Sequence, residues 1–86
     1  MRIELRLFGA FRELDSSAQI NLEIADGARV SELRKAVLAY GEQHWPEFRA
    51  GLLLRSAFAS EVAILRDGDL VPVQGQMVLL PPVSGG

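Results

Sequence analysis

Apolar and charged residues alternate in the first stretch of the chain. Ile3, Leu5 and Leu7 are separated by arginine and glutamate, and the segment 19–24 repeats the alternation with polar residues. Successive side chains of a strand point to opposite faces of a sheet, so a period of two predicts two strands that each bury one face. Two strands so close in sequence favour an antiparallel hairpin, and the connecting segment 9–18 is too long for a tight turn.

A helical period replaces the alternation after the turn signal Asp26-Gly27. Apolar residues then recur at intervals of three and four, at Leu33, Ala36, Val37 and Tyr40. This spacing places them on one face of a helix, with charged residues on the other face. Ser31 is the predicted N-terminal cap of this helix, and Gly41 is its predicted end.

The remaining segments are shorter and more apolar. Residues 42–54 contain aromatic and leucine side chains in a weaker pattern, which predicts a short helical turn or loop docked on the core. Three apolar segments follow, at Ala57–Ala59, Val62–Leu65 and Met77–Leu80. The last segment does not alternate, which predicts a central strand covered on both faces. This order of elements predicts an α+β domain with the helix on one face of the sheet.

Two prolines and two glycines follow the last predicted strand, in the run Pro81-Pro82-Val83-Ser84-Gly85-Gly86. Proline fixes φ and donates no backbone hydrogen bond, so Pro81 and Pro82 end sheet pairing and favour an extended exit from the domain. Gly85 and Gly86 lack Cβ, so their backbone fits a narrow channel and can approach a ligand closely. The run therefore predicts a slim stalk.

The chemistry of such a stalk is that of its terminal carboxylate. A carboxylate is unreactive until a leaving group is attached to it. Adenylation by ATP would supply that group, and a sulfur nucleophile could then displace AMP. We therefore predict a domain over residues 1–80 and a flexible tail over residues 81–86, whose reactive group is the carboxylate of Gly86.

Composition and charge exclude several other classes of function. The 86 residues carry a net charge of −2, no cysteine and one histidine, His44. The weak negative charge, without a basic stripe, argues against a nucleic-acid partner. No His/Cys metal cluster can form from one histidine, so we expect neither a metal nor an intrinsic cofactor. No apolar run is long enough to span a membrane and no segment has the pattern of a signal peptide, so the expected location is cytoplasmic.

Three segments resemble the small-subunit family of molybdopterin synthase: Phe8–Leu14, Val30–Leu33 and Leu79–Gly86. The most specific of these is the last. This family belongs to the β-grasp, ubiquitin-like group of sulfur carriers. The resemblance implies a mixed sheet whose last strand runs parallel to the first, with the main helix packed across one face and an extended C-terminal tail.

The resemblance also implies a reaction cycle. In this cycle an E1-like enzyme uses ATP to adenylate Gly86, and a sulfur donor enzyme converts the acyl-adenylate to a thiocarboxylate. The tail then enters the large subunit of molybdopterin synthase, which uses the sulfur to build the dithiolene of molybdopterin. The carrier delivers the sulfur and contributes no catalytic side chain.

The tail residues are predicted partner contacts because they enter the partner's active site: Pro81, Pro82, Val83, Ser84 and Gly85. Two predicted partner contacts precede the tail. Arg12 follows the first strand, and either contacts an acidic partner surface or pairs locally with Glu13 or Asp15. Leu80 would extend an exposed apolar patch toward a partner, because such patches mark docking faces.

Other functions are compatible with the same tail. A sulfur carrier of another pathway, such as thiamine synthesis, tRNA thiolation or amino-acid synthesis, would use the same activated carboxylate. A ubiquitin-like modifier would present it to lysine amines of target proteins. A plain binding domain would not use it at all, and would tolerate residues appended to Gly86.

Overall fold

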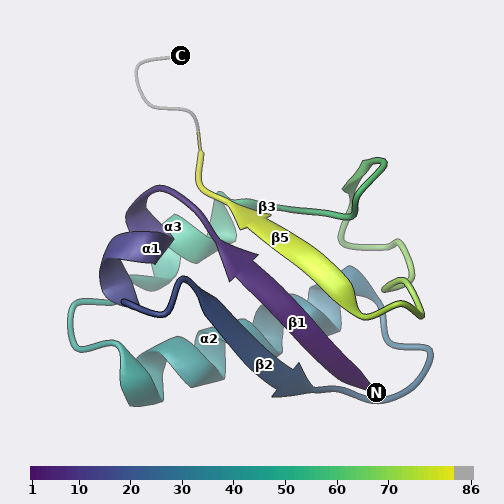
Figure 1. Ribbon diagram of the computed structural model, residues 1–86, viewed down its shortest axis with the longest axis horizontal. Coiled ribbons are helices and arrows are strands. Elements are labelled where there is room, and N and C mark those ends of the chain that lie inside the picture. The colour runs from purple at the N-terminus through teal and green to yellow at the C-terminus, as the bar shows by residue number, and fades with distance from the viewer. Residues whose placement is uncertain (83–86) are drawn as a thin grey trace.

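The structure is a computed structural model, and it describes residues 1–82 of the 86. Its strands and helices follow one another as β1 (Arg2–Leu7), α1 (Ala10–Leu14), β2 (Gln19–Glu23), α2 (Val30–His44), α3 (Ala50–Leu54), β3 (Ala57–Ala59), β4 (Ile64–Leu65) and β5 (Gln76–Leu80). The strands form one sheet in the order β2-β1-β5-β3-β4. Figure 1 shows α2 crossing behind this sheet, so that the helices cover one face and leave the other open.

The strand pairing makes the sheet mixed. β1 and β2 pair antiparallel, with Ile3 opposite Leu22 and Leu5 opposite Ile20, as the shared alternation predicts. β5 lies between β1 and β3, parallel to β1 and antiparallel to β3. The parallel pairing of the last strand with the first, together with the helix packed on one face, is the predicted β-grasp arrangement.

The core lies between the sheet and the helices. The alternation of β1 buries Ile3, Leu5 and Leu7 completely or nearly so and leaves the residues between them exposed. The helical face of α2 meets them with three fully buried side chains, Val30, Leu33 and Val37. Each such side chain contributes about 1.5–3 kcal/mol by leaving water, so these two periodic patterns account for much of the fold's stability.

The two predicted ends of the main helix are wrong. Ser31 lies inside α2, and the N-cap is Arg29, whose backbone N–H donates to Glu32 Oε1 at 3.3 Å. Gly41 does not end the helix, which continues to His44. A Cβ at Gly41 would lie 2.8 Å from Trp45 Cε3, so the glycine makes room for an aromatic side chain that packs back on the helix.

Two further differences concern the segments around the sheet. The connection 9–18 contains α1, which is too short to show a helical period and is anchored by the buried side chain of Phe11. β5 is central, as predicted, but it is not covered on both faces. Met77 and Leu79 are buried under the helices, whereas Val78 and Leu80 are half-buried on the open face.

Arg34 fastens three segments that are distant in the sequence. Although Arg34 lies on the charged face of α2, its side chain is only 14% exposed. Its Nη1 donates to the carbonyl oxygens of Leu53 at 2.6 Å and Ser56 at 2.9 Å, and its Nη2 to Asp67 Oδ1 at 2.8 Å. The guanidinium carbon also lies 5.0 Å from the centre of the Phe58 ring. Arg34 therefore holds α2, the end of α3 and the start of β3 together.

Asp15 makes a similar local connection, between α1 and the end of α2. Its carboxylate accepts hydrogen bonds from the Ser17 hydroxyl at 2.5 Å, the Ser17 backbone N–H at 3.0 Å and Trp45 Nε1 at 3.1 Å. The hydrogen bond from the Ser17 hydroxyl, followed by that from Trp45, lowers the pKa of Asp15 against the opposing effect of burial. The charged form of Asp15 is thus favoured in the folded state.

A substitution at Asp15 is expected to destabilise the fold more at neutral pH than at acid pH. A lowered folded-state pKa gives stability that is present above the unfolded-state pKa and is lost as pH falls through the folded-state pKa. We expect Asp15→Asn to reduce the free energy of unfolding by about 1 kcal/mol at neutral pH, and by less in acid, because the wild-type carboxylate is then protonated. Urea denaturation followed by Trp45 fluorescence measures this. Glu42→Gln, at an exposed position of α2, is the control, and equal losses at both pH values would contradict the assignment.

Candidate functional site

The chain leaves the sheet at the end of β5. Leu80 is the last residue of that strand and lies opposite Ala57 of β3, while Leu79 lies opposite Leu7 of β1. Pro81 is half-buried and Pro82 is exposed. The predicted tail residues Val83, Ser84, Gly85 and Gly86 lie outside the described residues. The site is therefore built from the surface that surrounds the exit of the chain, at the upper end of β5 in Figure 1.

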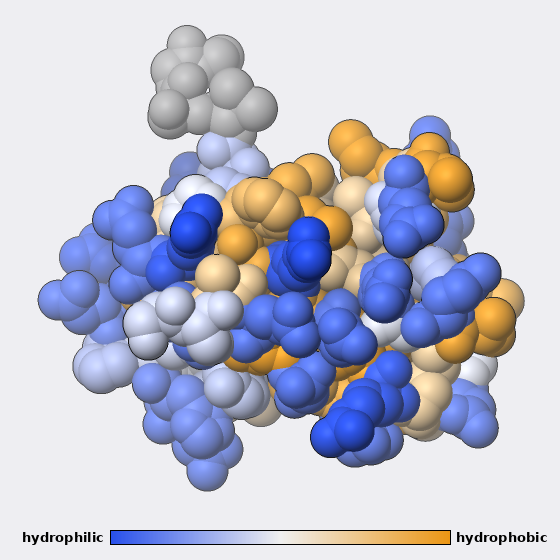
Figure 2. Space-filling model, in the orientation of Figure 1, coloured by the Kyte–Doolittle hydropathy of each residue, from blue (hydrophilic) through white to orange (hydrophobic). Residues whose placement is uncertain are grey.

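Apolar side chains gather on the open face of the sheet beside this exit. Strand register places Ala57 beside Leu80, and Ala59 beside both Val78 and Ile64, so these side chains share one face. Phe8 follows β1 and is 42% exposed, Ile64 is 70% exposed and Val62 of the β3–β4 turn is 92% exposed. We call this surface the open-face patch; its members are Phe8, Ala57, Val62, Ile64, Val78 and Leu80. Figure 2 shows it as orange side chains on the upper part of the sheet face.

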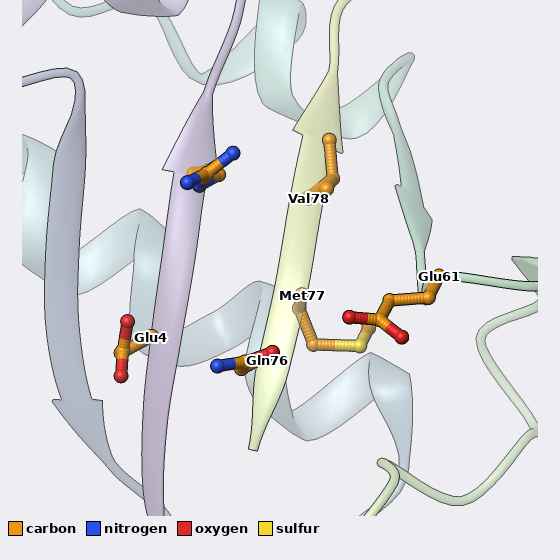
Figure 3. Close-up of a pocket in the computed structure, with 6 residues that line it drawn as sticks. Glu4, Glu61, Gln76, Met77 and Val78 are labelled. Atoms are coloured by element: carbon orange, nitrogen blue, oxygen red, sulfur yellow. The ribbon is translucent and has the colours of Figure 1, made fainter. Parts of the chain in front are cut away.

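The lower part of the same face is polar. A hollow of about 230 Å³ lies on the sheet and is lined by Glu4, Arg6, Glu61, Gln76, Met77 and Val78. Figure 3 shows Glu4 and Gln76 on neighbouring strands and Glu61 reaching toward β5 from the β3–β4 turn. The open-face patch is thus an apolar area with a polar border, which is the usual arrangement of a protein-binding surface.

The structure brings the two predicted contacts outside the tail to this region. Leu80 belongs to the open-face patch. Arg12 is exposed on α1 and lines, together with Arg6 and Phe8, a shallow hollow of about 260 Å³. Among residues 1–82, the structure shows no ion pair between Arg12 and either Glu13 or Asp15. The role of Arg12 toward an acidic partner stays a prediction.

Sequence patterns did not indicate most of the open-face patch. Its members come from β3, β4, β5, the β3–β4 turn and the residue that follows β1, and only the strand order brings these segments to one face. One signal was present: Phe8 continues the alternation of β1 on its polar side, where an aromatic residue is out of place. Val62 and Ile64 were recognised only as members of an apolar segment, with no prediction of exposure.

The described residues show neither a metal centre nor a membrane segment. Within 1–82, no group of three or more histidine, cysteine, aspartate or glutamate side chains is placed to hold a metal ion. None of the helices in this range is long and apolar enough to cross a bilayer. What the described surface offers is an apolar patch with a polar border next to the exit of the chain.

Comparisons with known proteins agree with this description. No family model matches the chain. The molybdopterin synthase sulfur carrier subunit of Synechococcus elongatus is 36% identical over 98% of this chain and 96% of its own length. The crystal structure of SAMP1 from Haloferax volcanii superposes over all of both chains with a TM-score of 0.70 at 19% identity, which supports the β-grasp, ubiquitin-like fold.

Proposed function

The chain belongs to the family of molybdopterin synthase sulfur carrier subunits, and we propose that it carries sulfur as a thiocarboxylate on Gly86. The observation that supports this most is the similarity to a sulfur carrier over nearly the whole of both chains. The exit of the chain at the end of a central strand, beside an apolar face, supports a tail that is delivered into a partner.

Three steps make up the proposed cycle. A carboxylate oxygen of Gly86 attacks the α-phosphorus of ATP, the bond to the β-phosphate breaks and pyrophosphate leaves. A sulfur nucleophile at the oxidation level of sulfide then attacks the carbonyl carbon of the acyl-adenylate and AMP leaves. The resulting thiocarboxylate enters the large synthase subunit, where its sulfur forms a bond to a carbon of the pterin precursor. Water then cleaves the bond between this sulfur and the carbonyl carbon of Gly86, which leaves the sulfur for the dithiolene of molybdopterin and restores the carboxylate.

The partners follow from these steps. An E1-like adenylating enzyme binds ATP, a sulfur donor enzyme supplies the nucleophile, and the large subunit receives the tail. ATP is a substrate of the activating enzyme, so the carrier needs no resident cofactor. We expect the cycle to run in the cytoplasm, where ATP is available.

We further propose that the large subunit docks on the open-face patch. A docking surface beside the exit allows the tail to reach the acceptor site while the domain is held in one orientation. Burying an exposed aliphatic side chain at the centre of an interface contributes binding energy that a charge at the same position would remove. The patch therefore predicts which substitutions separate docking from folding.

Ile64→Asp is expected to weaken binding to the large subunit by about 30-fold or more, because a carboxylate would be desolvated in the interface. The side chain is 70% exposed in the free protein, so the fold should tolerate the change. Leu54→Asp is the matched control, since Leu54 is 63% exposed but lies on α3, on the helical side. Isothermal titration calorimetry with the large subunit measures the dissociation constant of each variant. Equal affinities for the two variants would show that docking uses another surface.

The alternative functions differ in the acceptor and share the activated Gly86. A carrier of another pathway would bind a different sulfur acceptor and leave the large synthase subunit unbound. A protein modifier would give reductant-resistant conjugates with lysine side chains of other proteins. Binding to the large subunit in the titration above, without such conjugates in cell extract, would favour the molybdopterin carrier.

A further inference from the structure

Gly9 and Pro81 meet at the point where the chain leaves the sheet. The parallel pairing of β1 with β5 ends with Leu7 opposite Leu79, so the two strands finish at the same edge of the domain. Gly9 lies two residues after Leu7, and Pro81 lies two residues after Leu79. A Cβ built on Gly9 would lie 2.7 Å from Cγ of Pro81, 3.6 Å from its Cδ and 3.8 Å from its Cβ. The proline ring therefore rests on the bare backbone of the glycine.

The backbone of Gly9 is held in a conformation that favours glycine. Its φ of 56° and ψ of −129° correspond to the second position of a type II′ turn. Phe11 N–H donates to the Phe8 carbonyl oxygen at 3.2 Å across this turn, and Arg12 N–H donates to the Gly9 carbonyl oxygen at 3.0 Å. Phe11 is fully buried, so α1 anchors the turn in the core. These hydrogen bonds and the buried Phe11 side chain therefore hold the backbone of Gly9 in one position.

We propose that Gly9 and Pro81 are positioning residues for the activation of the tail, an inference that rests on the proposed function. Pro81 has a φ fixed by its own ring, and its ring is seated on Gly9. The contact therefore sets the direction in which the following residues leave the sheet. A carboxylate several residues further along must meet ATP in a defined geometry, and a small change of direction at its base moves it away from the α-phosphorus. We expect docking of the domain on the activating enzyme to change little, because the contact lies at the base of the tail and its loss leaves the folded domain in place.

Adenylation kinetics test the proposal through four variants. Gly9→Ala should lower kcat for the carrier by about tenfold or more and change its KM by no more than about twofold, because tail alignment suffers and docking does not. Gly27→Ala is the matched control: its φ of 78° also favours glycine, but a Cβ there would have no neighbour within 4 Å. Its kcat should stay close to that of the wild type.

Pro81→Ala and the double variant Gly9→Ala/Pro81→Ala separate the contact from backbone strain. Alanine at position 81 lacks Cγ and Cδ, and its Cβ would remain at an ordinary 3.8 Å from the new methyl group. Pro81→Ala alone should lower kcat by about threefold or more, since the seated ring is lost. Adding Gly9→Ala to it should then lower kcat by less than Gly9→Ala lowers that of the wild type, because the steric contact is already gone and only the backbone strain at position 9 remains.

Each outcome decides the proposal. Equal kcat values for Gly9→Ala and Gly27→Ala, or strictly multiplicative losses in the double variant, would overturn the positioning role. If Gly9→Ala does not fold, an unchanged kcat for Pro81→Ala would overturn it as well. If the wild-type chain is not adenylated by an enzyme that activates another carrier of the family, the proposed function itself fails, and this result is distinct from the others. The urea midpoints of all four variants measure the same steric contact between positions 9 and 81 through stability, independently of the adenylation assay.

Discussion

Deletion of Gly86 is expected to abolish molybdopterin formation while leaving the domain folded. The deletion leaves Gly85 as the final residue, one residue short of the α-phosphorus of ATP in the activating enzyme. Near-attack geometry in such reactions requires the reacting atoms to be about 3–3.5 Å apart, and one residue of extended chain spans about 3.3 Å. We expect a loss of at least about a thousandfold in product formed by the reconstituted synthase, which is measured by conversion of the pterin precursor.

A second variant, with a longer tail, tests the position of the carboxylate from the other side. Appending one alanine to Gly86 should be as harmful as the deletion, because the carboxylate is then attached to a different residue and lies too far along the channel. Both variants should retain the wild-type urea midpoint and bind the large subunit through the open-face patch. Wild-type product yield from either variant would show that Gly86 does not carry the sulfur.

Replacement of Arg34 is expected to have the largest effect on stability. Arg34→Ala removes donors from the carbonyl oxygens of Leu53 and Ser56 and from the carboxylate of Asp67. Buried acceptors left without a partner cost about 1–3 kcal/mol each, reduced where water can enter. We expect the free energy of unfolding to fall by about 2–4 kcal/mol, a large part of the stability of a domain of this size. Urea denaturation provides the measurement.

Arg34→Lys distinguishes geometry from charge. The planar guanidinium reaches acceptors on α3, β3 and the turn at Asp67 in fixed directions, whereas a lysine ammonium cannot satisfy all of them. We therefore expect lysine to recover less than half of the loss. Lys35→Ala, at the next and exposed position of α2, should change stability by less than about 0.5 kcal/mol. A similar result for Arg34→Ala and Lys35→Ala would refute the role given to Arg34.

The role of Arg34 also bears on function. Ser56 immediately precedes β3, and Ala57 of β3 lies opposite Leu80 at the chain exit. Arg34 therefore stabilises the strand that borders the base of the tail and supplies part of the open-face patch. Weaker binding to the large subunit in Arg34→Lys than in Lys35→Ala would be the functional sign of this connection.

Periodic patterns predicted the parts of the fold in which one face is buried. The alternation in β1 and β2 and the helical spacing in α2 are consequences of a single sheet face packed on a helix, so their pairing and packing were confirmed. α1 was missed because five residues give little more than one helical turn. Gly41 was misinterpreted because glycine within a helix can serve a close approach, here that of Trp45, as well as an end.

In the candidate site, too, local sequence patterns bear on one part, the tail, and not on the other, the open-face patch. The sequence of residues 81–86 suffices to propose a tail chemistry, because prolines, glycines and a carboxylate act locally, and that chemistry stays a prediction. The open-face patch could not be predicted, since residues as distant in sequence as Ile64 and Val78 come to one face only through strand order and register. The apolar β5 was interpreted as covered on both faces, when the half-buried positions Val78 and Leu80 instead form part of the proposed docking surface.

The central claim, that Gly86 carries sulfur, is tested most directly by intact-mass spectrometry. The wild-type chain, with nothing appended to Gly86, is incubated with ATP, an E1-like enzyme and a sulfur donor, and its mass is compared with that of a sample without ATP. We predict a gain equal to the replacement of one oxygen by sulfur, assigned to Gly86 by fragmentation and dependent on all three components. An unchanged mass, with an enzyme shown to activate another carrier in the same assay, would contradict the claim.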